Sequence, residues 1–199
     1  MKMKKRIKPV NKFMLLTLIT IFSISCDDAL IPKPLGYYRI DFPEKQYIKY
    51  QGNCPYTFEY PKRSLLYDKI PGKPDCWMNL HYPQYGATIH FTYNQLEGGD
   101  LGKYIEDSRK LVMKHIVKAD DILESMISNK SENVYGLTYD FSGNTATIYQ
   151  FFITDSSNHF LRGSMYFNLP PNPDSLAPVS SYIKKDLTHF INTFKWKAQ

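Results

Sequence analysis

The residues whose types most readily suggest catalysis are Asp155, Ser156 and His159, a carboxylate, a hydroxyl and an imidazole close together in the chain. A hydrolytic triad requires nucleophile, base and orienting group to converge in one geometry. Here all three fall in or beside a single turn-forming run, TDSSN, where Asp and Ser more often bond their own backbone. We therefore expect a structural turn and no catalytic residues.

His81 and His90 form a second suggestive pair. A hairpin built from residues 76–82 and 87–93, with Tyr82 paired to Ala87, would place both on one face. A zinc site needs three or four ligands and a supporting second shell of hydrogen bonds. The neighbouring threonines and asparagine suit a polar surface better. The interpretation is no metal site and no cofactor.

The three cysteines, Cys26, Cys54 and Cys76, have different expected roles. If Cys26 is lipidated, two remain in an oxidising envelope compartment, where pairing is the default. A Cys54–Cys76 disulfide would close a loop of about twenty residues and stabilise the fold by roughly 3 kcal/mol. The alternative is two free buried thiols.

Residues 1–25 are typical of a lipoprotein signal peptide. Six basic residues and no acid precede an apolar run over 13–24, which is followed by Ser25 and Cys26. Ser23 departs from the usual pattern, which has leucine three positions before the cysteine. A plain signal peptide or an uncleaved anchor are the alternatives. We expect cleavage before Cys26, lipidation there, a tether over 26–36 and one domain over 37–199, attached to a membrane on the periplasmic side.

The basic character of the chain belongs to this signal. The formal net charge is +6, and residues 1–25 carry six of the positive charges, so the mature chain is neutral (+6 − 6 = 0). A neutral mature chain gives no electrostatic case for binding nucleic acid.

The elements that position these residues centre on 144–167, where two aromatic and β-branched runs flank the TDSSN turn. Both faces of the first run are largely apolar, which predicts a central hairpin covered on both sides. Further strands are predicted over 56–60, 76–82, 87–93 and 134–141, with a loop over 63–75; residues 122–128 fit either strand or helix.

Two helices complete the pattern. Gly98, Gly99 and Asp100 open the first, whose buried side is predicted to hold Leu101, Tyr104, Ile105, Leu111, Val112 and Ile116. Asp174 or Ser175 caps the last helix, with Pro178 in its first turn. The fold class is therefore α+β, a mostly antiparallel sheet of about six strands flanked by helices. This element order resembles the PsbP/Mog1-like fold.

Sixteen tyrosines and twelve phenylalanines exceed what a core of about 160 residues needs. Exposed aromatic side chains are enriched at protein interfaces. The candidates for an interface lie near the tether: Tyr37, Tyr38, Phe42, Tyr47 and Tyr50. The alternative is that this segment wraps the sheet edge and buries them. Ser175, in Asp-Ser-Leu, resembles a bacterial O-glycosylation acceptor, although a helix cap would compete for the same hydroxyl.

Several long blocks resemble the gliding-motility lipoprotein family GldD of Bacteroidetes-type bacteria, namely PKPLGYYRIDFPEKQY, CPYTFEYP, CWMNLHYP, ATIHFTY, VYGLTYDFSGNTATIYQFFITDSSNHFLRGSMYF and NTFKWK. The resemblance covers nearly all of the mature chain. It implies an envelope lipoprotein needed for gliding and linked to the type IX secretion machinery, with no catalytic residues to transfer.

Two hypotheses of function follow. The first is a non-enzymatic lipoprotein that docks onto motility or secretion proteins. The second is an envelope hydrolase or small-ligand-binding lipoprotein that uses a pocket between sheet and helix. A flat apolar patch would favour the first, and a concave pocket with convergent polar groups would favour the second.

The signal predicts how the protein is processed. Mass spectrometry of membrane-extracted protein should find Cys26 as the acylated N-terminus, and Cys26→Ala should release or mislocalise the domain, because the lipid is the expected membrane attachment. An unmodified N-terminus at another residue would refute the assignment.

Overall fold

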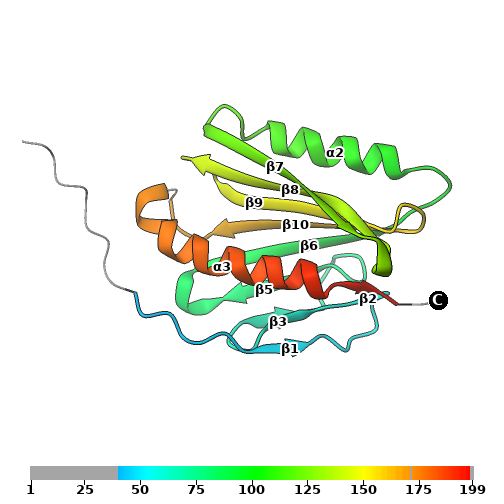
Figure 1. Ribbon diagram of the computed structural model, residues 1–199, viewed down its shortest axis with the longest axis horizontal. Coiled ribbons are helices and arrows are strands. Elements are labelled where there is room, and N and C mark those ends of the chain that lie inside the picture. The colour runs from blue at the N-terminus through cyan, green and yellow to red at the C-terminus, as the bar shows by residue number, and fades with distance from the viewer. Residues whose placement is uncertain (1–39, 171, 198–199) are drawn as a thin grey trace, which may run out of the picture. The chain divides into compact units, whose positions relative to one another are not determined.

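The computed structural model describes residues 40–170 and 172–197, which belong to one compact unit, residues 39–199 (Figure 1). The elements in chain order are β1 (Tyr47–Lys49), β2 (Tyr56–Thr57), β3 (Glu59–Pro61), β4 (Leu65–Tyr67), β5 (Met78–Tyr82), η1 (Pro83–Tyr85), β6 (Ala87–Gln95), α2 (Leu101–Met113), β7 (Ala119–Asn129), η2 (Lys130–Glu132), β8 (Val134–Gly143), β9 (Thr147–Thr154), β10 (His159–Phe167), α3 (Pro173–Thr193) and β11 (Lys195–Trp196).

The main sheet has seven antiparallel strands in the order β4-β5-β6-β10-β9-β8-β7. The predicted hairpin is β9–β10, and it lies at the centre, as expected. The predicted pairing of Tyr82 with Ala87 also holds. The α+β class is confirmed, with one strand more than expected: β4 forms inside the segment predicted to be a loop, and residues 122–128 are part of strand β7.

Each face of the central hairpin is covered by a different helix, because successive side chains point to opposite sides of a strand. Phe151 belongs to the cluster that packs under α3, together with Ile183 and Phe190. Phe152 belongs to the cluster that packs under α2, with Val112. The two covers follow from a strand pair that is apolar on both faces (Figure 1).

Three details of the helices differ from expectation. The N-cap of α3 is Asn172, whose Oδ1 accepts from the Ser175 backbone N–H at 3.2 Å. The helix therefore starts earlier than predicted, and Pro178 lies beyond its first turn. Asp100 occupies the N-cap of α2 without a side-chain hydrogen bond. Leu111 and Ile116, predicted to be buried, are exposed, because α2 ends at Met113 and only one stripe of it faces the sheet.

Two small two-stranded sheets lie at the end of the domain that holds the C-terminal part of α3. The predicted strand 56–60 is split, so that β2 pairs with β11 and β3 pairs with β1. Aromatic side chains from this region, including Tyr56 and Phe58, pack onto Phe190 and Phe194. The core under α3 therefore extends beyond the main sheet.

Two glycines provide a matched test of how closely β8 packs against β9. A Cβ at Gly136 in β8 would collide with the Phe152 carbonyl, which is backbone and cannot move aside, whereas one at Gly102 in α2 meets nothing within 4 Å. Gly136→Ala should destabilise the domain by about 1–3 kcal/mol, and Gly102→Ala should stabilise it by about 0.5–1 kcal/mol. Urea unfolding measures the free energy of unfolding of both variants. Equal changes in the two would contradict the close contact between β8 and β9.

Candidate functional site

The turn that carries Asp155, Ser156 and His159 holds a structural hydrogen-bond network. Asp155 Oδ1 accepts from the backbone N–H groups of Ser157, Asn158 and His159 at 2.8–3.0 Å. Burial alone would raise the pKa of this carboxyl, but these N–H groups outweigh it and lower the pKa. Ser156 has a left-handed backbone, with φ of 71°.

His159 is buried at the start of β10 rather than in the turn, and its Nδ1 lies 2.8 Å from the hydroxyl of Tyr93. Among the described residues, no hydrogen bond joins His159 to Ser156. The turn interpretation therefore describes Asp155 and Ser156 well, while His159 contributes to the packing of the sheet.

His81 and His90 do lie on one face of the β5–β6 pair, but each is engaged with a polar neighbour. His81 Nδ1 is 3.0 Å from Thr88 Oγ1, and His90 Nδ1 is 2.8 Å from Asn79 Oδ1. Within residues 40–170 and 172–197, no group of three or more His, Cys, Asp or Glu side chains could hold a metal ion. These histidines form part of a polar sheet surface.

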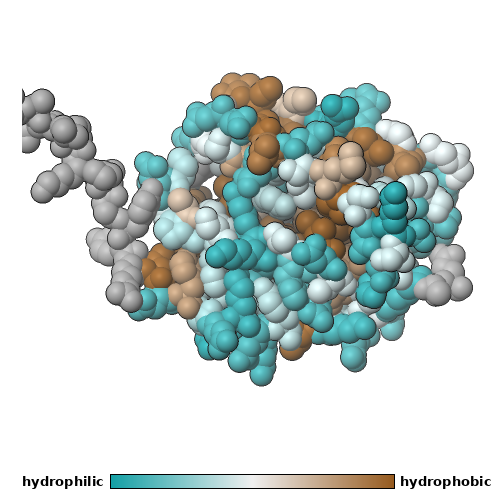
Figure 2. Space-filling view, in the orientation of Figure 1, coloured by the Kyte–Doolittle hydropathy of each residue, from teal (hydrophilic) through white to brown (hydrophobic). Residues whose placement is uncertain are grey.

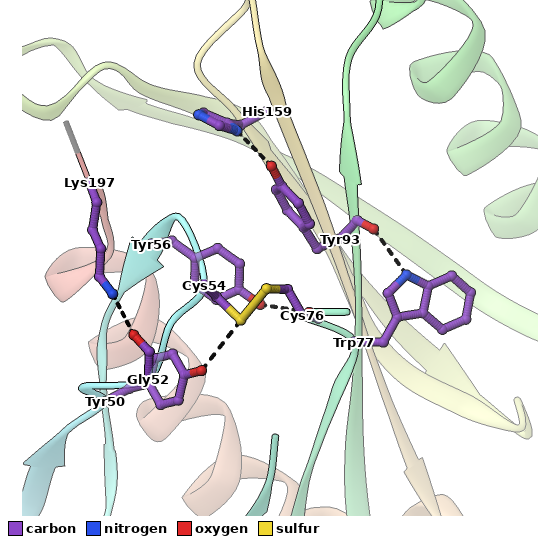
Figure 3. Close-up of a disulfide and its surroundings, with 9 residues drawn as sticks. All are labelled: Tyr50, Gly52, Cys54, Tyr56, Cys76, Trp77, Tyr93, His159 and Lys197. Atoms are coloured by element: carbon purple, nitrogen blue, oxygen red, sulfur yellow. Dashed lines mark hydrogen bonds between the residues drawn. A yellow bond between two sulfur atoms is a disulfide. The ribbon is translucent and has the colours of Figure 1, made fainter. Parts of the chain in front are cut away.

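Cys54 and Cys76 form a disulfide with a Cα–Cα distance of 5.5 Å (Figure 3). The hydroxyl of Tyr50 donates to Cys54 Sγ at 3.3 Å, and that of Tyr56 donates to the Cys76 carbonyl at 2.8 Å. Lys197 donates to the Gly52 carbonyl at 2.5 Å from the other end of the chain. The bridge therefore fixes the segment before β2 onto β5, beside the C-terminal strand.

The segment before and within β1 is fastened to α3 by the buried carboxylate of Asp186, which is 3% exposed. Lys45 forms an ion pair with Asp186 Oδ1, and the Tyr47 hydroxyl donates to the same oxygen at 2.8 Å. Lys45 also donates to the Tyr182 carbonyl at 2.9 Å and lies over the Tyr182 ring. Burial and the hydrogen bond to Asp186 raise the pKa of Tyr47, which keeps it a donor.

This arrangement corrects the expected exposure of three aromatic residues. Tyr50 is buried, Tyr47 stacks on His189, and Phe42 stacks on Tyr182 with ring centroids 4.5 Å apart. The alternative considered from the sequence, a segment that wraps the sheet edge and buries its aromatics, describes Tyr50, whereas Tyr47 and Phe42 are half-buried. Tyr37 and Tyr38 lie outside the described residues.

Ser175 is exposed in the first turn of α3, and its backbone N–H, not its hydroxyl, takes part in the cap. The expected competition for the hydroxyl is therefore absent, and glycosylation stays a prediction. Cys26, the signal peptide and the tether lie outside the described residues.

A cleft of about 210 Å³ lies between the β8–β9 turn and the N-terminal half of α3, with Thr145, Ala146 and Leu176 in its walls. Lys184 is the one charged residue among the described side chains that line it, and its Nζ is paired with Asp140 at 2.5 Å. Three of its other polar side chains are engaged with the backbone, because Thr145 and Ser180 donate to carbonyls and Asn172 caps α3.

The most distinctive surface is apolar and surrounds strand β7, an edge of the main sheet. Six of the eleven exposed large hydrophobic residues in the described chain fall between residues 111 and 126, so the exposure is concentrated here. We define the β7 edge patch as Met113, Ile116, Val117, Leu123 and Met126, which are 52–88% exposed. Figure 2 shows hydrophobic surface over the turn that joins α2 to β7.

Sequence reasoning missed this patch and the Asp186 contact. A signal was present for Asp186, because it falls three residues after Ile183 and four before Phe190, on the apolar side of the last helix. The patch had no comparable signal, since exposed and buried apolar residues look alike in the sequence.

These features define a class of protein: an α+β domain closed by a disulfide, with an exposed apolar strand edge and no assembled catalytic group among the described residues. The family model for the gliding motility lipoprotein GldD matches residues 27–196, and the chain belongs to this family. Membership indicates an envelope-anchored lipoprotein with a role in gliding motility, and the family is not a known enzyme family.

Other comparisons add little to the family assignment. No curated protein matches the chain. The solution structure of cyanobacterial PsbP (CyanoP) from Synechocystis sp. PCC 6803 is similar, with a TM-score of 0.46 and 12% identity over 82% of this chain and 99% of that chain. Among the described residues, no helix is both long and apolar enough to cross a bilayer.

The Asp186 contact yields a second matched test. Asp186→Ala should destabilise the domain by about 3 kcal/mol, because it leaves Lys45 without its buried partner. Asp140→Ala removes the carboxylate of the more exposed Lys184–Asp140 pair, where the side chains are 26% and 37% exposed, and should cost at most about 1 kcal/mol. Denaturant unfolding compares the two. Similar losses would mean that Asp186 does not fasten the N-terminal segment.

Proposed function

We propose that this lipoprotein is a non-enzymatic docking component of the gliding machinery and of the associated type IX secretion machinery. The observation that carries the proposal is the β7 edge patch. Large apolar side chains that are exposed together in one region of a domain often mark a surface that another molecule covers.

The backbone of β7 offers a specific way to bind. This strand is 11 residues long and pairs on one side with β8, and none of the strands in residues 40–170 and 172–197 pairs with its other side. An unpaired strand edge can accept a further strand from another protein through main-chain hydrogen bonds. The exposed side chains then determine which strand is accepted, and we propose an extended segment of a partner protein as the occupant.

The two faces of β7 would contact such a strand differently. Met126 points to the side of α2 and Leu123 to the side of α3, because their registry partners Leu137 and Asp140 lie on opposite faces of β8. Both side chains flank the free edge. A partner strand with apolar residues on both faces would therefore bury more surface than one with a polar face.

Acidic residues limit what can pair with the first half of β7. Asp120, Asp121 and Glu124 are exposed along this strand. Charges on an edge strand disfavour unselective pairing. They favour a partner that places lysine or arginine opposite them, which supplies selectivity beyond the apolar contact.

The alternative, an envelope hydrolase or ligand-binding lipoprotein, has weaker support. Its expected pocket between sheet and helix corresponds to the cleft at Leu176, whose charged residue Lys184 is neutralised by Asp140. The Asp155 carboxylate is committed to the turn backbone. The apolar edge is therefore the better basis for a function.

The test replaces Leu123 and Met126 together with serine in the native lipoprotein. Because both side chains are exposed, abundance and thermal stability should change little, within about 0.5 kcal/mol for each site. Gliding and in-cell crosslinking to partner proteins should be lost, since a few central apolar residues carry most of an interface's energy.

The matched control is Leu65→Ser on β4, the strand at the opposite edge of the same sheet, where Leu65 is 48% exposed. This variant should glide normally. Normal gliding by the Leu123/Met126 double variant would refute the docking surface. A stable but non-motile Ser156→Ala variant would favour the enzyme instead.

A further inference from the structure

A pocket of about 400 Å³ lies between the C-terminal end of α2 and the first half of β7. Its apolar wall is formed by the buried Val112, by the exposed Met113 and Ile116, and by Ile122 of β7. Met113 and Ile116 also belong to the β7 edge patch. The pocket therefore adjoins the strand edge at which we propose that a partner binds.

Three carboxylates line the same pocket, and none of its lining residues in the described chain is a lysine, arginine or histidine. The carboxylates belong to Asp120, Asp121 and Glu124, which are exposed. Within residues 40–170 and 172–197 none of them forms an ion pair, whereas Asp140 and Asp186 each bind a lysine. The pocket thus combines an apolar wall with negative charge that this part of the chain does not neutralise.

Glu124 is the carboxylate whose direction is best defined. It pairs with Tyr139 in the β7–β8 register, and Tyr139 packs in the cluster under α2, so Glu124 lies on the α2 side of the sheet as well. Burial and the charge of Glu124 raise the pKa of Tyr139, while the charge of Arg109 acts in the opposite direction. Arg109 is exposed on α2, does not line the pocket and forms no ion pair with Glu124. Glu124 can therefore bind a cation from another molecule.

We propose that this pocket receives a lysine side chain of the partner strand that binds along β7; the inference rests on the docking function proposed above. A lysine side chain has an apolar four-carbon stem and a terminal ammonium. The stem would lie against Met113 and Ile116, and the ammonium near Glu124. A compact ammonium with three N–H donors suits carboxylates at different positions better than a planar guanidinium, whose fork matches one carboxylate.

The pocket would also determine how the partner strand aligns with β7. Successive side chains of a strand point to opposite faces, so a slip by one residue would move the lysine from the α2 side to the α3 side. On the α3 side the ammonium would meet Leu123, which is 62% exposed, in place of Glu124. One lysine therefore selects both the partner and its register.

The experiment measures, by fluorescence anisotropy, the binding of labelled peptides to the full-length lipoprotein in a neutral detergent. The peptides have 11 residues, the length of β7. They alternate threonine and valine, except that the central residue is lysine, norleucine or glutamate. Norleucine keeps the four-carbon stem and lacks the ammonium. The lysine peptide should bind about fivefold more tightly than the norleucine peptide, because exposed ion pairs each add a modest free energy, and the glutamate peptide should bind most weakly.

Glu124→Gln keeps the shape of the side chain and removes its charge. It should reduce the preference for the lysine peptide by about threefold and leave the binding of the norleucine peptide unchanged. Glu97→Gln is the matched control, because Glu97 is exposed between β6 and α2 and does not line the pocket; this variant should keep the full preference.

The outcomes separate the lysine pocket from the docking function. If the three peptides bind equally and the Leu123→Ser/Met126→Ser variant binds none of them, β7 accepts a strand but the lysine pocket is wrong. If none of the peptides binds the unaltered protein, both proposals are wrong. An unchanged lysine preference in Glu124→Gln would also overturn the pocket, since replacing an exposed carboxylate leaves the fold intact.

Discussion

The structure depends on a central strand pair that is apolar on both faces. Adjacent residues Phe151 and Phe152 point to opposite sides of β9, so the domain requires a cover on each side. The covers are unequal: α3 has 21 residues and α2 has 13, which gives lengths of about 32 and 20 Å. Seven strands spaced at about 4.8 Å extend about 29 Å across. The shorter helix therefore leaves parts of its face open, and Met113 and Ile116 of the β7 edge patch lie at and just beyond its C-terminal end.

The segment leading into the domain is integrated with the core rather than free to present its aromatics. Asp186 lies within the buried stripe of α3 and receives hydrogen bonds from Lys45 and Tyr47. Phe42 stacks on the same helix through Tyr182. A pull on the expected lipid anchor would therefore be transmitted to the longest helix and to the sheet beneath it.

The sequence predicted those features that depend on local periodicity. The central hairpin, the Tyr82–Ala87 register and both helices were accessible because alternating and 3.6-residue patterns determine which face is buried. Features set by long-range packing could not be predicted. For Tyr47 and Tyr50, the sequence does not show whether the tyrosine packs against the domain or faces solvent. Strand β4 was missed because it is three residues long and is stabilised by β5 alone. The cap of α3 moved to Asn172 because any of several polar residues there can accept from the helix N-terminus.

Two charged side chains of opposite sign, the buried Asp186 and the half-buried Arg162, differ in how the domain compensates them. Asp186 is contacted by three donors, Lys45, Tyr47 and more distantly Tyr82 at 3.5 Å, so its charge is compensated within the chain. Arg162 has one neutral acceptor, Gln150, and lies beside donors that are themselves unpartnered. Asp186 can be buried because donors of this chain compensate its charge, and these contacts in turn stabilise the fold. Arg162 is only half-buried, so its guanidinium keeps contact with water and needs less compensation than Asp186, which is stable in the core because three donors meet it.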